Sequence, residues 1–204
     1  WGDDGDAQIS NIPEGDFISV DNGNYHSCAL SSEGEIYCWG NNDDGQSNSP
    51  EGMYKSVVVG AFFSCALDKD GYAHCWGDDS KGMISNTPNS RFSELSASWN
   101  LVCGLDLEGN LECWGDDSLN AVTAVPSGQF TKVASARDVG CAINTNEEVE
   151  CWGHSSLPTY QDVPTGTFKH ISADGYTACA ISNDDQLVCW SNYSDLLIGD
   201  MDGD

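Results

Sequence analysis

Basic residues are scarce in this sequence. Its 204 residues include 7 Lys and Arg against 33 Asp and Glu, which gives a formal net charge of −26. A field of that sign repels phosphate backbones and anionic membrane surfaces, so we expect no nucleic-acid partner. The excess acid is typical of a solubilising surface. Attraction for cations or for a basic protein partner is the alternative interpretation.

Long apolar segments and catalytic motifs are missing as well. No apolar run approaches the ~20 residues that a membrane-spanning helix needs, so we expect no membrane insertion. The sequence has no phosphate-binding glycine loop, no nucleophile elbow and no repeated pair of carboxylates at catalytic positions. We therefore expect that the protein is not an enzyme.

Cysteine, in contrast, is plentiful and regular. All ten cysteines fall into pairs separated by ten positions, successive pairs are 37 or 38 residues apart, and tryptophan follows each second cysteine. The pairs are Cys28 with Cys38, Cys65 with Cys75, Cys103 with Cys113, Cys141 with Cys151, and Cys179 with Cys189. A second marker, Pro-x-Gly/Ser-x-aromatic, recurs in step from Pro13, Pro50, Pro88, Pro126 and Pro164. Two markers with one period indicate a repeat protein whose units must stack to form a core.

Each cysteine pair is predicted to lie in a β-hairpin. Pairing Leu30 with Ile36 across a short turn places Cys28 directly opposite Cys38, where Cβ atoms ~4.5–5.5 Å apart come near enough for a disulfide after small adjustment. Zinc is the alternative, but zinc sites favour cysteines two to four apart. Five local disulfides would indicate an oxidising compartment, so we expect a secreted or cell-surface protein.

A short strand is predicted before each hairpin. It carries an aromatic and an aliphatic residue three positions apart, as in Phe17 and Val20. That step alone would suit a helix, but the β-branched residues, the glycines and the brief length favour a strand. The hairpin turns contain glycine in the first three repeats and Glu147 or Asp185 in the last two, so the last two turns are expected to be strained or differently shaped.

The repeated phrase resembles a known family. Gly23-x-x-His26-Ser27-Cys28-Ala29-Leu30 followed by Gly34-x-x-x-Cys38-Trp39-Gly40 is similar to the regulator-of-chromosome-condensation repeat, and the second repeat carries the same phrase. The resemblance implies a β-propeller, and the Cys-Trp-Gly variant resembles its extracellular branches, which include plant receptor-kinase ectodomains. The founding member is a nuclear exchange factor for a small GTPase. A disulfide-rich chain at −26 departs from that setting, and we do not expect that activity.

We therefore expect an all-β fold, a β-propeller of about five short-stranded blades. A single domain would cover residues 1–192, with repeats near 13–50, 51–87, 88–125, 126–163 and 164–192, and residues 193–204 would form an acidic tail or the start of a linker. Trp1-Gly2 occupies the same repeat position as Trp190-Ser191. In a closed ring of five blades one of these segments would be surplus.

The sequence differs from repeat to repeat just before the first cysteine of each pair. In a propeller these positions should lie together near one face, and all five contain an aromatic residue or arginine, the types enriched at binding hot spots. The candidate partner-binding residues are Asn24, Tyr25, Phe62, Trp99, Asn100, Arg137, Asp138 and Tyr176. The alternative is that these aromatics plug the central channel or cover turns.

Other polar residues are given structural interpretations. His26 has no recurring acid partner or nucleophile, so we expect it to pack and to form hydrogen bonds. Acid pairs such as Asp78-Asp79 leave calcium as an alternative, but their loops lack the spacing of a known calcium loop, and we expect no cofactor. Asn192 begins a glycosylation sequon that fits a secreted protein.

The sequence favours a non-enzymatic extracellular recognition or adhesion module that presents the variable ring to a protein or glycan. One alternative is a structural subunit of a cell-surface assembly or filament, in which a terminal segment bridges copies of the chain. Another alternative is an accessory or inhibitor domain of a larger secreted protein.

Overall fold

The computed structural model describes residues 4–153, 163–175 and 177–191. The structured elements in this part of the chain are all strands, and they form five three-stranded antiparallel sheets, each built from consecutive strands. We call these sheets blades 1 to 5. No helix among the described residues is long and apolar enough to cross a membrane. The all-β class and the five blades predicted from the sequence are confirmed.

Every blade has the same strand order, inner strand, middle strand and outer strand. Blade 1 contains β1 (Phe17–Asn22), β2 (His26–Ser31) and β3 (Ile36–Gly40), and blade 2 contains β4 (Tyr54–Val59), β5 (Phe63–Asp68) and β6 (Ala73–Gly77). Blade 3 contains β7 (Phe92–Ser98), β8 (Leu101–Asp106) and β9 (Leu111–Gly115). Blade 4 contains β10 (Phe130–Ser135), β11 (Val139–Asn144) and β12 (Val149–Gly153), and blade 5 contains β13 (Phe168–Asp174), β14 (Thr177–Ser182) and β15 (Leu187–Ser191).

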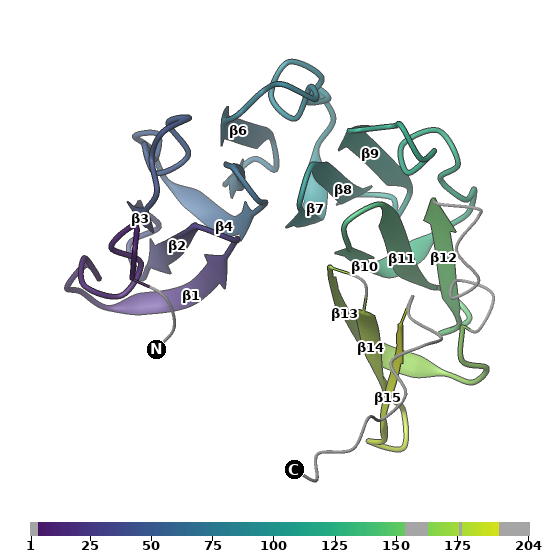
Figure 1. Ribbon diagram of the computed structural model, residues 1–204. Coiled ribbons are helices and arrows are strands. Elements are labelled where there is room, and N and C mark those ends of the chain that lie inside the picture. The colour runs from purple at the N-terminus through teal and green to yellow at the C-terminus, as the bar shows by residue number, and fades with distance from the viewer. Residues whose placement is uncertain (1–3, 154–162, 176, 192–204) are drawn as a thin grey trace, which may run out of the picture.

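The blades follow an arc from β1–β3 to β13–β15, with blades 1 and 5 at its two ends (Figure 1). Each blade packs on the next one along the chain. The arrangement is therefore an open arc. The closed ring of five blades, which the sequence had allowed, is not formed. The curvature between successive blades is too small for five of them to complete a circle.

The cysteine pairs form the predicted hairpin disulfides. In each blade the first cysteine, on the middle strand, lies directly opposite the second cysteine, on the outer strand. All five pairs are bonded, with Cα–Cα distances of 4.0 to 4.1 Å. The bonded pairs are Cys28 with Cys38, Cys65 with Cys75, Cys103 with Cys113, Cys141 with Cys151, and Cys179 with Cys189. The disulfides follow from the hairpin register, because that register brings each pair together within one blade.

The two ends of a bridge differ in burial. The second cysteine is the more accessible of the two, since the outer strand lies at the rim of the blade: Cys75 and Cys151 are partly buried and Cys189 is exposed. Their partners Cys65 and Cys141 are buried. Each bridge therefore connects the packed middle strand to the rim.

A β-bulge in each inner strand explains the three-residue spacing of its apolar residues. The bulge lies just after the aromatic residue, for example between Phe17 and Ser19. A bulge adds one residue to the strand and shifts its alternation by one position. Residues three apart, such as Phe92 and Leu95, then face the same side, and both are buried in one cluster.

The last two hairpin turns keep the shape of the first three. Gly34, Gly71 and Gly109 have φ angles of 95°, 96° and 85°, and Glu147 and Asp185 stand at the equivalent positions with φ of 67° and 64°. Side chains other than glycine adopt this left-handed region at a cost. The strain expected in these two turns is confirmed, and the alternative of a different shape is not observed.

The cores lie between blades. One cluster joins Cys28, Leu30 and Ile36 of blade 1 to Tyr54 and Val57 of blade 2, and equivalent clusters join blades 2 and 3, 3 and 4, and 4 and 5. The tryptophans that follow the second cysteines are structural. Trp39, Trp76, Trp114 and Trp152 donate their indole N–H to the carbonyls of Gln8, Gln46, Met83 and Ala121 at 2.8 to 3.0 Å.

Candidate functional site

The loops between the inner and middle strands meet at one end of the blades. They comprise residues 23–25, 60–62, 99–100, 136–138 and 175–176, and the structure describes all of these positions except Tyr176. We call the described residues of these five loops the loop surface. The blade geometry places it at the end of the strands opposite the hairpin turns that precede the outer strands.

The first two loops are joined by their aromatic rings. Tyr25 and Phe62 are stacked, with ring centroids 5.2 Å apart and an angle of 21° between the planes. Tyr25 is 41% exposed, and Phe62 is partly buried. The stack holds two large side chains at the surface in fixed positions, which reduces the conformational entropy that a partner would have to remove on binding.

The third and fourth loops are joined by a cation–π contact. The Arg137 guanidinium carbon lies 4.2 Å from the centroid of a Trp99 ring, and Arg137 Nε lies 3.8 Å from Asp138 Oδ2. Trp99 has φ of 44°, because only Trp99 and Asn100 connect β7 to β8 and the chain must reverse within these two residues. A bulky residue in this region is rare and frequently accompanies a functional constraint.

Main-chain hydrogen bonds connect the remaining loops. The Ala61 N–H donates to the Trp99 carbonyl at 3.0 Å, and the Arg137 N–H donates to the Gly175 carbonyl at 3.1 Å. Together with the two side-chain contacts, these bonds link all five loops in chain order. The predicted residues Tyr25, Phe62, Trp99 and Arg137 are thus brought into one continuous surface.

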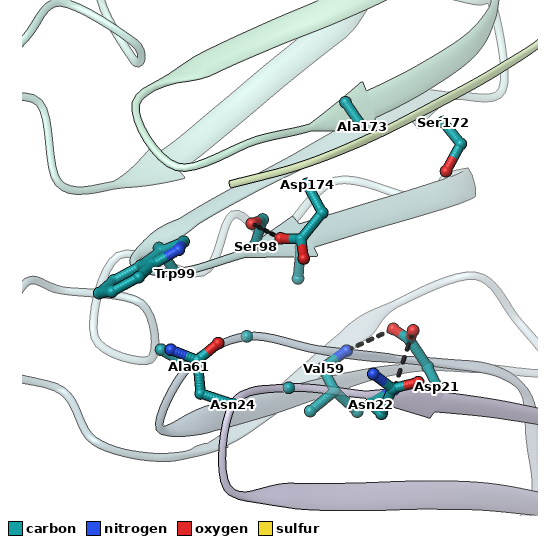
Figure 2. Close-up of a pocket in the computed structure, with 13 residues that line it drawn as sticks. Asp21, Asn22, Asn24, Val59, Ala61, Ser98, Trp99, Ser172, Ala173 and Asp174 are labelled. Atoms are coloured by element: carbon teal, nitrogen blue, oxygen red, sulfur yellow. Dashed lines mark hydrogen bonds between the residues drawn. The ribbon is translucent and has the colours of Figure 1, made fainter. Parts of the chain in front are cut away.

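A polar pocket of about 230 Å³ opens beside the loop surface, where the ends of the inner strands of blades 1, 2, 3 and 5 approach one another (Figure 2). Asn24, Ala61 and Trp99 belong to both the loop surface and the pocket lining. Asp21 lines it from β1, and Asp174 lines it from the end of β13. Figure 2 shows both carboxyl groups facing the space between the blades.

The two carboxylates are held by different donors. Asp21 Oδ2 accepts a hydrogen bond from the Val59 N–H at 2.8 Å, and Asp174 Oδ1 accepts one from Ser98 Oγ at 2.8 Å. Burial raises the pKa of the Asp21 carboxyl, the backbone N–H groups of Val59 and Asn22 oppose this rise, and the charge of Asp174 adds to it. The charge of Asp174 therefore acts on Asp21 across the pocket.

The sequence interpretation missed Asp21, Ser98 and Asp174. They lie at or next to the ends of inner strands, but they do not share one position of the repeat. Asp21 pairs with Cys28, whereas Ser98 and Asp174 pair with residues two positions before their cysteines. The one available signal was an acid near the end of the inner strand in blades 1 and 5. Nothing in the repeat shows that these ends meet.

His26 has a structural environment. Its side chain is buried, and its Nε2 lies 2.8 Å from Ser64 Oγ of the next blade. Burial lowers the pKa of His26 to about 4. Although a histidine–serine contact is the geometry of a nucleophile and its base, Ser64 is completely buried and out of reach of a substrate.

The acid pairs after the tryptophans organise their own loops. Asp79 Oδ1 accepts the N–H groups of Ile84 and Ser85, and these bonds lower the pKa of its carboxyl. In the described part of the chain, no group of three or more His, Cys, Asp or Glu side chains is placed to hold a metal ion. The absence of a cofactor stays a prediction. Asn192, the predicted glycosylation site, and Tyr176 lie outside the described residues.

The repeats match a known family model, the regulator of chromosome condensation (RCC1) repeat, at residues 17–46 and 54–82. No curated protein matches the chain in a comparison of sequences.

Solved structures give the same assignment of the fold. The ectodomain of the Arabidopsis thaliana receptor kinase ACR4 is 27% identical with a TM-score of 0.70, over 86% of this chain and 63% of that one. The ectodomain of the Physcomitrella patens receptor kinase CR4 is 29% identical with a TM-score of 0.74, over 86% and 50%. Saccharomyces cerevisiae Prp20p, at 18% identity and a TM-score of 0.68 over 85% and 56%, shares the fold. The chain thus spans half to just under two thirds of the length of these proteins.

Proposed function

Because the chain is an RCC1-type repeat protein with a β-propeller fold, we propose that it is a non-enzymatic recognition module that acts outside the cell and binds a protein partner through the loop surface. A shared fold does not specify a function, so the proposal depends on the site. The single observation that carries it is the unbroken series of contacts that joins Tyr25, Phe62, Trp99 and Arg137 across the first four loops.

The composition of this surface favours a protein ligand. Tyrosine, tryptophan and arginine dominate the energetics of protein interfaces, because they bury a large area and also form polar contacts. Blade 4 has Arg137 and Asp138 in the same loop, so a blade forms without an aromatic residue at these positions. The fixed stacking of the aromatics provides an anchor region surrounded by the polar Asn24, Asn100 and Asp138.

The extracellular location is supported by two observations. Five disulfides persist in an oxidising compartment and are rare in the cytosol and nucleus. The two receptor-kinase structures with 27% and 29% identity are ectodomains. Prp20p, whose structure is described with its binding to Gsp1p and histones, shares the fold at lower identity, and the net charge of −26 here gives no reason to transfer those partners.

The test compares two sets of substitutions. We expect that purified secreted and cell-surface proteins include a ligand whose affinity falls at least about tenfold when Tyr25, Phe62 and Trp99 are all changed to serine. The matched control is Tyr37→Ser with Tyr72→Ser, which removes tyrosines of similar exposure (40% and 37%) from outside the loop surface. Far-UV circular dichroism checks that both variants are folded, and biolayer interferometry measures binding.

Four results would contradict the proposal. The first is equal loss of binding in both variants, and the second is full binding by the loop variant. The third is a ligand found only on a glycan array, which would replace the protein partner by a carbohydrate. Acceleration of nucleotide exchange on a small GTPase would contradict the non-enzymatic role.

A further inference from the structure

We propose that the pocket between Asp21 and Asp174 receives a cationic side chain, arginine or lysine, from the protein partner. The inference rests on the proposed function and adds a chemical specificity to it. The pocket and the loop surface share Asn24, Ala61 and Trp99, so a partner docked on the loops would cover the pocket mouth. A side chain that projects from the centre of such a partner would enter it.

The charge of the pocket has one sign. Asp21 and Asp174 approach from opposite ends of the arc, and none of the 13 lining residues is lysine, arginine or histidine. The other lining groups are small side chains, backbone, the amides of Asn22 and Asn24, two serines and Trp99. A cation between the carboxylates would convert their mutual repulsion into two attractions, in a recess where solvent screens charges less than at an open surface.

The carboxylates are positioned before any ligand arrives. Ser98 Oγ fixes one oxygen of Asp174, and the N–H groups of Val59 and Asn22 each donate to one oxygen of Asp21. Each carboxylate has about four acceptor sites, so these bonds leave lone pairs for a further donor. Guanidinium and ammonium groups carry several N–H donors and no acceptor, which matches a pocket whose charged groups only accept.

The size of the pocket favours a side chain over a larger cofactor. Its volume of about 230 Å³ lies below the roughly 300–1,000 Å³ of typical small-molecule sites. A nucleotide would also bring negative charge against the two acids. A single basic side chain, connected to a larger interface on the loop surface, fits both the volume and the charge.

The experiment uses a capped peptide, acetyl-Gly-Gly-Arg-Gly-Gly-amide, and the same peptide with glutamine in place of arginine. Titration of the oxidised protein is followed by NMR. We expect shifts of the backbone amides of Ala61, Ser98 and Ala173 with the arginine peptide only. The affinity should fall at higher ionic strength.

Asp174→Asn tests the carboxylate without removing the acceptor for Ser98, because an amide oxygen can take the same hydrogen bond. We expect it to weaken binding of the arginine peptide at least about tenfold, since hydrogen bonds to charged groups are the stronger class. Asp184→Asn is the matched control, because it makes the same change of charge on the exposed β14–β15 turn, at the other end of blade 5.

Equal weakening by Asp174→Asn and Asp184→Asn would show general attraction to an acidic protein and would overturn the proposal. Equal binding of the glutamine peptide, or full binding to Asp174→Asn, would also overturn it. The proposed function has a separate readout. If the triple loop variant loses its protein ligand while Asp174→Asn keeps it, the loop surface stands and only the pocket inference fails.

Discussion

Val20 of blade 1 and Val57 of blade 2 occupy the same position of the repeat, opposite Ala29 and Ala66. Val57 is 7% exposed, because Cys28, Leu30 and Ile36 of blade 1 cover it. Val20 is 64% exposed, and no described blade packs on its face of β1. A blade therefore has no complete core of its own, and the burial of its inner strand depends on the preceding blade, as expected for a repeat protein.

The largest difference in stability between a covered and an uncovered inner strand is expected when its aromatic residue is removed. Phe92 of blade 3 is completely buried, whereas Phe17 of blade 1 is partly exposed and contacts Tyr37 edge-on at 5.7 Å. Phe92→Ala should reduce the free energy of unfolding by about 3–5 kcal/mol, because it leaves a cavity between blades 2 and 3. Phe17→Ala should cost about 1 kcal/mol. Urea unfolding with the disulfides intact measures both, and equal losses would disprove the dependence on the preceding blade.

The interface between blades 1 and 2 should be sensitive to acid through His26. Its pKa is about 4 in the folded protein and 6.5 for the ordinary side chain, because burial disfavours the charged form. The unfolded chain binds a proton at His26 more readily than the folded protein does. The stability that neutral His26 provides is therefore complete above about pH 6.5, and it is lost as the pH falls to about 4. The loss reaches about 3 kcal/mol, from ~1.4 kcal/mol per pKa unit.

Leucine occupies the position of His26 in blade 3, as Leu101. His26→Leu should therefore remove this part of the pH dependence, while the carboxylates of both proteins titrate alike. The measurement is the difference in free energy of unfolding between the two proteins from about pH 7 to about pH 4, the range that spans the two pKa values. A difference that stays constant over this range would show that His26 is not the group responsible.

Loss of one disulfide should affect a single blade. Replacing Cys103 and Cys113 with serine removes a bridge across ten positions in blade 3. A bridge that closes so short a loop stabilises by about 3 kcal/mol or less, mainly through the unfolded chain. Hydrogen exchange should show faster opening in β8 and β9 and little change in blades 1 and 5. Unfolding of the whole protein would contradict the view that each disulfide stabilises its own blade.

The smallest effect on stability is expected for a hydrogen bond between two inner strands. The Val59 N–H of blade 2 donates to Asp21 of blade 1, and the Ser135 N–H of blade 4 donates to Ser96 Oγ of blade 3. Asp21→Val should cost about 1 kcal/mol and speed exchange of the Val59 amide, whereas Asp21→Ser should restore most of its protection, because serine makes the equivalent bond in blade 3. If both variants exchanged alike, the bond would contribute nothing.

The residues of the loop surface could be predicted only in part. Because equivalent positions of a propeller lie near one face, the sequence indicated Tyr25, Phe62, Trp99 and Arg137 as one group, and the structure places them in contact. Which of these residues contact one another could not be predicted from the sequence. Stacking of Tyr25 on Phe62, and of Arg137 on Trp99, depends on rotamers and on the two-residue turn that gives Trp99 its positive φ.

The sequence by itself determined the hairpins, the five disulfides and the number of blades, because each depends on residues close together in the chain and repeats with one period. Only the tertiary structure decided which of two equivalent residues is buried, how far the arc closes, and where a pocket forms. The hydrogen bond from Ser98 to Asp174 joins residues 76 positions apart that follow no repeat. Such contacts depend on the angle between blades, and that angle is the sum of many packing contacts that no single repeat encodes.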